Sequence, residues 1–234
     1  MRRHTALALA AVATLSSLAM PRPGQAQDVS RAAAGGGISV SGWQGKVDAQ
    51  EERRGRSLND ARLAQEGDAL HVTTGPAVIY WNPANRASGD YTVKATFTEP
   101  KYMNLNDHPH PYGVFIAGND LGTDQESLLY CAAYGNGTVI VRGFGPQPFQ
   151  LNGRGESNAA VHKAAGPGKP VTQEIALTVK GGTVACAVNG TVVASYDKAT
   201  VVTAGKLKST DGVYGIRFAH NTEGLVTGLT VTKP

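Results

Sequence analysis

The chain has 234 residues, of which 41% are hydrophobic and 17% charged, so it is not an intrinsically disordered protein and is short for a multidomain enzyme. Its 29 glycines follow no fixed repeat, which excludes collagen and indicates many turns. Three of the 22 basic residues (Arg2, Arg3 and Arg22) belong to an expected leader, which leaves 19 against 18 acidic ones. A domain with a net charge of +1 has no basic surface for nucleic acid, despite the sequence pI of about 9.1.

Residues 1–26 have the three parts of a signal peptide. A basic start (2–4) precedes an uncharged stretch rich in Ala and Leu (5–20), and Gly-Gln-Ala at 24–26 offers small residues to a signal peptidase. The alternative is an uncleaved membrane anchor, although a spanning helix needs ~20 apolar residues. We therefore expect an exported protein, periplasmic or extracellular, with no stable membrane insertion.

Residues 27–37 are rich in Ala and Gly and predict a flexible tether, followed by a single domain over 38–234. Apolar and polar residues alternate over 69–74, 91–98 and 174–179, as in half-buried strands. Further strand-like runs occupy residues 77–81, 112–117, 128–134, 138–143, 183–188, 191–194, 213–219 and 225–232.

No apolar stretch keeps a helical period for long, and at best Ser57–Gln65 or Ser157–Ala165 forms a short helix. About a dozen short strands without a helical layer predict an all-β fold, an antiparallel two-sheet jelly-roll sandwich. In such a fold, the outer concave face and the rim loops hold ligands. The longest turn-rich segments are 104–111 and 145–170.

Two Asn-Gly pairs predict hairpins, because a two-residue type I′ turn needs positive φ at both central residues. Asn189-Gly190 joins 184–188 to 191–194, and Asn136-Gly137 joins 128–134 to 138–141. Pairing across the second turn predicts one face with Tyr130, Ala132, Tyr134, Val139 and Val141, and another with Leu129, Cys131, Ala133, Ile140 and Arg142.

Cys131 and Cys186 are the two cysteines, and each lies in a strand-like run. In an oxidising compartment they would form a disulfide bond, whereas the alternative is a pair of small buried hydrophobic residues. Spacing alone does not decide between the two, and without matched histidines they form no zinc site.

Two motifs have residue types that bind metals. His108 and His110 alternate with prolines in an extended segment, and Asp107 lies beside them. With no third ligand nearby, we expect these histidines in a solvated loop that contributes to ligand binding and not a metal site. The loop around Asp120 and Asp124 has the oxygen ligands that calcium prefers, but it lacks the ligand pattern of an EF-hand. We expect a turn whose side chains cap their own backbone, and no cofactor, with calcium as the alternative.

The remaining candidates point to sugar chemistry. Arg142 lies on a hairpin with two apolar faces, and Arg217 lies on a strand whose Tyr214, Ile216 and Phe218 face the core. Together with Tyr134, such arginines suit sugar hydroxyls through planar donors and aromatic stacking. The alternative is a pair of structural, salt-bridged arginines.

Several short motifs occur in the order typical of one family: Ser41-Gly42-Trp43, Gly67-Asp68-Ala69-Leu70, residues 112–116 (Tyr-Gly-Val-Phe-Ile), Val188-Asn189-Gly190 and 215–220 (Gly-Ile-Arg-Phe-Ala-His). The chain thereby resembles, over roughly 38–234, the 3-keto-disaccharide hydrolase-like domains, a branch of the concanavalin A-like (laminin G-like) jelly rolls. Two residues, Trp43 and His220, match positions of that family. Trp43 is expected to have a packing role.

The resemblance implies an exported hydrolase of 3-keto-glycosides or other glycosides. Glu126 and His220 are the candidates for its catalytic acid. The alternatives are a non-catalytic carbohydrate-binding module and a structural envelope protein without a small ligand. The sequence leaves the oligomeric state open.

Overall fold

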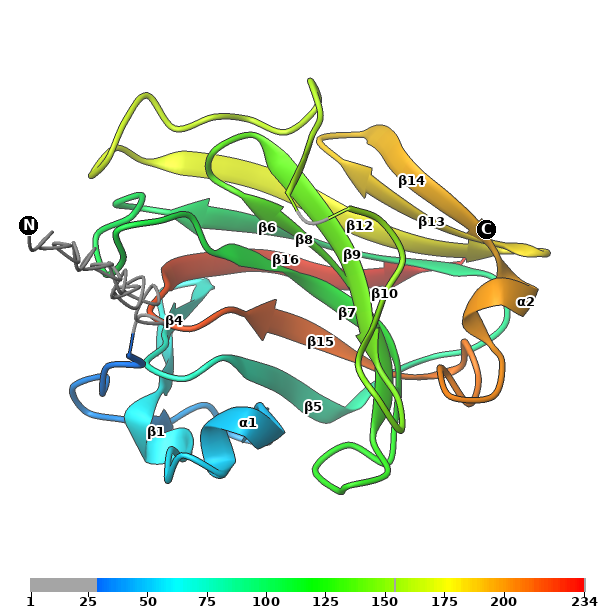
Figure 1. Cartoon of the computed structure of the whole chain (residues 1–234), viewed down its shortest axis with the longest axis horizontal. Helices are drawn as coiled ribbons and strands as arrows, with labels where there is room; N and C mark the ends of the chain where they lie inside the picture. The colour runs from blue at the N-terminus through cyan, green and yellow to red at the C-terminus, as the bar shows by residue number, and fades with distance from the viewer. Residues whose placement is uncertain (1–28, 154, 234) are drawn as a thin grey trace, which may run out of the picture.

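The computed structural model describes residues 29–153 and 155–233, and strands dominate it (Figure 1). The expected signal peptide, residues 1–26, lies outside the described residues. No helix in the described part of the chain is long and apolar enough to cross a membrane.

The first sheet contains eight strands among the described residues. In spatial order they are β1 (Gly37–Ile38), β3 (Arg62–Glu66), β4 (Ala69–Thr73), β16 (Glu223–Thr232), β6 (Tyr91–Glu99), β12 (Val171–Lys180), β13 (Thr183–Val188) and β14 (Thr191–Asp197). The pair β1–β3 is parallel and the other neighbours are antiparallel.

The second sheet also has eight described strands, all antiparallel to their neighbours. Its spatial order is β10 (Phe149–Gln150), β9 (Thr138–Phe144), β8 (Ser127–Tyr134), β7 (Pro111–Asn119), β15 (Gly212–Phe218), β5 (Val78–Ala87) and β2 (Gln44–Val47), and β11 (Glu156–Ser157) also pairs with β9. The helices are short: α1 (Ala49–Glu52), the 3₁₀ helix η1 (Leu58–Asp60) and α2 (Lys198–Val201).

The core lies between the two sheets, because alternate residues of each strand point inward. Tyr80, Phe97 and Phe218 are among its largest fully buried side chains. Cys131 on β8 and Cys186 on β13 form a disulfide bond across this core, with their Cα atoms 6.0 Å apart. The antiparallel jelly-roll sandwich predicted from the sequence is therefore confirmed.

Of the two segments that could have formed a short helix, the first has only a single 3₁₀ turn and the second has no helix. In the first segment, the Ser57 hydroxyl accepts a hydrogen bond from a backbone N–H of the single turn η1, and the chain then becomes strand β3, which pairs with β4 and buries Leu63. Burial of an apolar side chain on the sheet outweighs the weak helical pattern.

In the second segment, residues 157–165, the chain begins as β11 and continues in turns. Side chains of the neighbouring strands hold it there. Gln173 bonds both the backbone N–H and the carbonyl of His162, and Asn189 donates to the carbonyl of Ala160. These bonds occupy backbone groups that a helix would use internally.

The turn at Asn189-Gly190 has two residues, both with positive φ, as predicted. The other hairpin differs by one residue. Tyr134 lies opposite Thr138, so the loop has three residues; the Gly137 N–H donates to the Tyr134 carbonyl, and Gly137 has φ +89°. A three-residue loop of this type ends in a left-handed glycine.

That extra loop residue shifts the register of β9 by one and exchanges its two faces. Ile140 and Arg142 therefore share a face with Tyr130 and Tyr134, and not with Cys131 as the two-residue turn predicted. The other residues of the core face are Leu129, Ala133, Val139 and Val141.

The described part of the expected tether, residues 29–37, is hydrogen-bonded to the domain. The N–H of Ala33 bonds to the carbonyl of Asp60, and the N–H of Arg31 bonds to the Asn221 side chain. β1 then adds its two residues to the edge of the first sheet. These backbone bonds dock the segment on the domain.

Candidate functional site

The outer face of the second sheet, turned away from the core, holds a groove of about 980 Å³. Two of the groove's lining residues, Tyr130 and Ile140, belong to a second buried cluster that is separate from the main core. The members of that cluster are Ile79, Trp81, Phe115, Leu128, Tyr130, Ala132, Ile140 and Val213. The groove is bounded by residues just before β7, just after β15, and around α1.

Strand register decides which side chains face the groove. Tyr130 lies directly opposite Arg142, and Tyr134 directly opposite Thr138, and all four line it. The sequence-predicted residues His108, His110, Tyr134, Arg142, Arg217 and His220 also lie along this groove.

Arg217 forms a bidentate ion pair with Asp48, with both N–O distances at 2.6 Å. Its guanidinium is buried and lies 5.6 Å from the ring centre of Tyr130 and 5.5 Å from that of Phe144. Burial is the largest single effect on the pKa of Arg217 and lowers it, but the charge of Asp48, the effect of Tyr130 and the hydrogen bonds to the guanidinium together outweigh burial and raise the pKa. Arg217 therefore has the structural, salt-bridged role that the sequence left as an alternative.

Arg142 is different. Its side chain is half-buried, and its buried Nε atom has no hydrogen-bond partner among the described residues. Its guanidinium also has no ion pair among the described residues. Because a guanidinium carries five N–H donors and no acceptor, Arg142 can donate hydrogen bonds to oxygens of a molecule in the groove.

His108, His110 and His220 meet at one end of the groove. The ring centres of His108 and His110 are 4.3 Å apart, and those of His110 and His220 are 4.1 Å apart. The sequence separated these histidines into ligand-binding and catalytic candidates, but the structure places them in one cluster.

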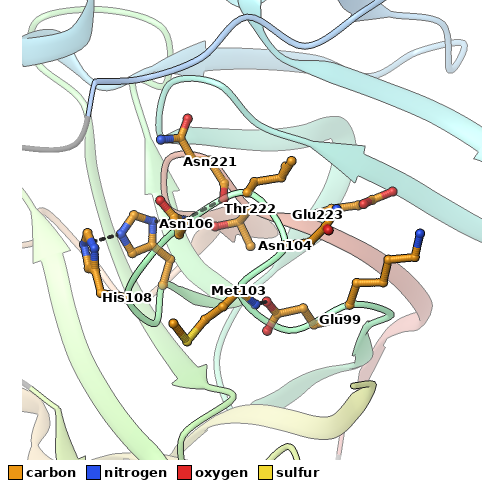
Figure 2. Close-up of a pocket in the computed structure, with 11 residues that line it drawn as sticks. Glu99, Met103, Asn104, Asn106, His108, Asn221, Thr222 and Glu223 are labelled. Carbon is orange, nitrogen blue, oxygen red and sulfur yellow. Dashed lines mark hydrogen bonds between the residues drawn. The ribbon is translucent and has the colours of Figure 1, made fainter. Parts of the chain in front are cut away.

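A small polar pocket (Figure 2) adjoins this end of the groove. His108 and His110 line both the pocket and the groove. Glu99 lies on the other side of the pocket from His108 in this view. Its Oε1 accepts a hydrogen bond from the backbone N–H of Met103, while its buried Oε2 has no partner among the described residues. Burial raises the pKa of Glu99 to about 7, against the smaller opposing effect of the Met103 hydrogen bond.

Glu126, the other expected catalytic residue, is not among the residues that line the groove. It precedes Ser127 at one end of the β7–β8 pair, whereas the histidines lie at the other end, where Pro111 faces Tyr134. Glu126 instead contacts Lys46 at 3.5 Å, and burial raises its pKa. The structure thus does not bring Glu126 and His220 into one site.

The loop around Asp120 and Asp124 makes several contacts within the protein. The Asp120 carboxylate pairs with Lys208, and the Thr123 hydroxyl donates to the Asp120 carbonyl. The Thr123 hydroxyl also accepts a hydrogen bond from the Gln125 N–H. These bonds form the self-capping turn that the sequence favoured.

The sequence interpretation missed Asp48 and Asn106. Asp48 is 169 residues from Arg217 in the chain. Asn106 fixes the histidine end of the groove through the carbonyls of His220 and Asn221. Neither lies in a motif, so only the fold reveals its role.

Comparison with known proteins supports the fold. Neither a family model nor a curated protein matches this sequence. Among solved structures, the carbohydrate-binding module CBM66 from Bacillus subtilis is similar, with a TM-score of 0.54, 8% identity, and coverage of 84% of this chain and 98% of that one.

A Bacillus subtilis protein of unknown function with a galectin-like fold is also similar, with a TM-score of 0.54, 13% identity and coverage of 82% and 89%. At such low identities, these similarities show a jelly-roll fold and nothing more. They do not show membership of the 3-keto-disaccharide hydrolase family that the sequence resembles.

Proposed function

We propose that this protein is an exported carbohydrate-binding protein that holds a sugar in the groove of its second sheet. The observation that carries the proposal is the pairing, on the groove floor, of two tyrosines with an arginine that has no ion pair among the described residues. Tyr130 and Arg142 are direct cross-strand neighbours, and Tyr134 lies four residues further along β8, on the same face.

Sugars combine weakly apolar C–H faces with a dense set of hydroxyl groups. An aromatic ring packs against the C–H face, and a planar guanidinium donates to two oxygens at once. The groove volume of about 980 Å³ is at the upper end of the range for small-molecule sites. The lining of the groove combines the rings of Tyr130 and Tyr134 with many polar and charged side chains, among them Arg142, which can exchange hydrogen bonds with hydroxyl groups.

Similarity to CBM66 supports the proposal, because that protein is a carbohydrate-binding module on a similar fold. The fold alone does not determine function, so the groove residues carry the argument.

The test is binding to a glycan array, followed by titration calorimetry with the best glycan. Loss of a hydrogen bond to a charged donor costs about 1.5–3 kcal/mol, so Arg142→Ala should weaken binding by roughly 10- to 100-fold. The control is Arg86→Ala, which removes an exposed arginine from β5 outside the lining of this groove and should leave binding unchanged.

If no glycan binds the wild-type protein, or Arg142→Ala binds as well as the wild type, the proposal is wrong. A structural envelope protein without a small ligand would then be the better account.

Hydrolysis of 3-keto-glycosides or other glycosides is the second candidate, favoured by the position of His220 on the groove. The reaction needs a proton donor near the leaving oxygen. Incubation with a 3-keto-glucoside should release free sugar from the wild-type protein and not from His220→Ala. Binding without release would leave the non-catalytic module.

Export is part of the proposal and is supported by the leader and by the disulfide bond, since such bonds persist in oxidising compartments. Mass analysis of the secreted protein should show an N-terminus at or near Gln27. An intact Met1 would contradict export through cleavage.

A further inference from the structure

Three histidines meet where β7 and β15 lie side by side. His108 and His110 precede β7, and His220 follows β15, in which Phe218 lies opposite Tyr112. The ring nitrogens available to a metal ion all lie within 4.8 Å of one another. Among the described residues, this is the one group of three or more His, Cys, Asp or Glu side chains with such spacing.

Hydrogen bonds determine which ring nitrogens of His108 and His110 carry protons. Nδ1 of His108 lies 2.6 Å from the Asp107 carboxylate, and Nδ1 of His110 lies 2.5 Å from the backbone carbonyl oxygen of His220. Both oxygens only accept hydrogen bonds, so both Nδ1 atoms are donors. A neutral imidazole has one N–H, which leaves a lone pair on each Nε2.

The amide of Asn106 agrees with this assignment. Its nitrogen lies 2.7 Å from Nδ1 of His110, but also 2.6 Å from the Asn221 carbonyl and 3.3 Å from the His220 carbonyl. The two carbonyls take its two hydrogens, so Nδ1 of His110 is not needed as an acceptor.

The two Nε2 atoms, of His108 and His110, face each other at 2.7 Å. Two lone pairs at this distance repel each other unless a proton or a metal ion lies between them. A metal-bound histidine typically donates its other N–H to a carboxylate or a backbone carbonyl, and Asp107 and the His220 carbonyl occupy those positions here.

We propose that His108, His110 and His220 bind one divalent transition-metal ion, such as zinc, at the end of the groove. Imidazole nitrogens suit zinc, copper and nickel, whereas calcium and magnesium prefer oxygen ligands. Three protein ligands leave one position of a tetrahedral ion open, and all three histidines line the groove.

Binding requires a small adjustment. Two nitrogens at about 2.1 Å from one tetrahedral ion lie roughly 3.4 Å apart, so the Nε2 atoms must separate by about 0.7 Å. His108 can move, because its side chain is 52% exposed and it lies in a loop. His110, in contrast, is buried, and its ring is held against the His220 carbonyl.

The position of His220 is well supported. The next residue, Asn221, has a left-handed backbone with φ +47°, its N–H bonds to the Gly75 carbonyl, and its side chain bonds to Arg31 and Val29. His220 therefore lies beside a hydrogen-bonded turn, whereas the half-exposed His108 has room to shift toward an ion.

The metal proposal does not rest on carbohydrate binding, and its test uses no sugar. The mature protein is stripped with a chelator and titrated with Zn²⁺ by calorimetry, and with Co²⁺ to record visible absorption. The wild type should bind one equivalent of Zn²⁺, and Co²⁺ should give the strong absorption of a tetrahedral complex.

His108→Ala should weaken Zn²⁺ binding at least tenfold, and Asp107→Asn roughly tenfold, since loss of the supporting partner typically costs 10- to 100-fold. The control is His162→Ala, an exposed histidine outside the cluster, which should bind Zn²⁺ like the wild type. Zn²⁺ should also raise the Tm of the wild type but not that of His108→Ala.

A wild-type protein that binds no Zn²⁺ at 1 mM would overturn the proposal and leave a shared proton between His108 and His110. Equal affinities of the wild type and His108→Ala would also overturn it. If His108→Ala does not fold, Asp107→Asn decides, because that side chain is 87% exposed and its loss should not unfold the domain. Failure of glycan binding would leave this result unaffected.

Discussion

Replacement of Arg217 by alanine should destabilise the domain strongly, although this side chain faces a groove. The side chain is 8% exposed and donates two hydrogen bonds, both 2.6 Å long, to the carboxylate of Asp48. Removing the arginine leaves the Asp48 carboxylate, itself 26% exposed, without its counter-charge.

The magnitude follows from these contacts. Removing one partner of a buried ion pair costs about 3–5 kcal/mol of folding stability. Because Asp48 is partly exposed, we take the lower end of that range for this pair. Loss of the contacts with the rings of Tyr130 and Phe144 adds about 1 kcal/mol. We expect Arg217→Ala to lower the free energy of unfolding by about 4 kcal/mol.

The assay is urea-induced unfolding under non-reducing conditions, with a double-mutant cycle. Asp48→Ala is the second single variant, and the double variant should cost clearly less than the sum of the two. Arg142→Ala is the matched comparison, because Arg142 is a half-buried groove arginine without an ion pair among the described residues. It should cost about 1 kcal/mol or less.

Equal costs for Arg217→Ala and Arg142→Ala, or additive effects in the cycle, would show that the Asp48 pair does not stabilise the fold. The two arginines would then be equivalent, as the sequence alone suggested.

Three further outcomes are expected. Burial raises the pKa of Glu99 from 4.5 to about 7, so the folded state binds this proton more tightly than the unfolded state. The free energy of unfolding should therefore fall by up to ~3 kcal/mol as the pH rises from about 4.5 to about 7. Urea titrations at several pH values should show this dependence in the wild type and not in Glu99→Gln. The Cys131–Cys186 bond links residues 55 positions apart, so the double variant Cys131→Ser and Cys186→Ser should lower the free energy of unfolding by about 4 kcal/mol, measured by thermal unfolding. An unchanged stability would show that the bond does not stabilise the fold. Phe218→Ala should cost ~3–5 kcal/mol by leaving a core cavity, whereas a cost under 1 kcal/mol would mean that the neighbouring rings collapse into the space.

The strands could be predicted from local patterns. The alternation of residues 91–98 appears as β6, with Tyr91, Val93, Ala95 and Phe97 buried. The two-residue turn at Asn189-Gly190 was also predicted, because a type I′ turn depends only on the conformation of its own residues. Local periodicity and turn chemistry therefore determined the jelly-roll class.

The register of the β8–β9 hairpin was not determined in this way. Two glycines flank Asn136, and both a two-residue and a three-residue loop fit the sequence. The choice depends on which face of β9 the core buries, and one residue of shift exchanges Val141 with Arg142. Tertiary packing placed Arg142 in the groove.

The composition of the site also required the tertiary structure. His220 is 110 residues from His110 in the chain, and Asp48 is 169 residues from Arg217. Whether such side chains meet depends on which strands are neighbours, and pairing of β7 with β15 is a long-range property of the sheet. The sequence determined the residue types available to the site, and strand order brought them together, because side-chain chemistry is local whereas contacts between distant strands depend on the packing of the whole chain.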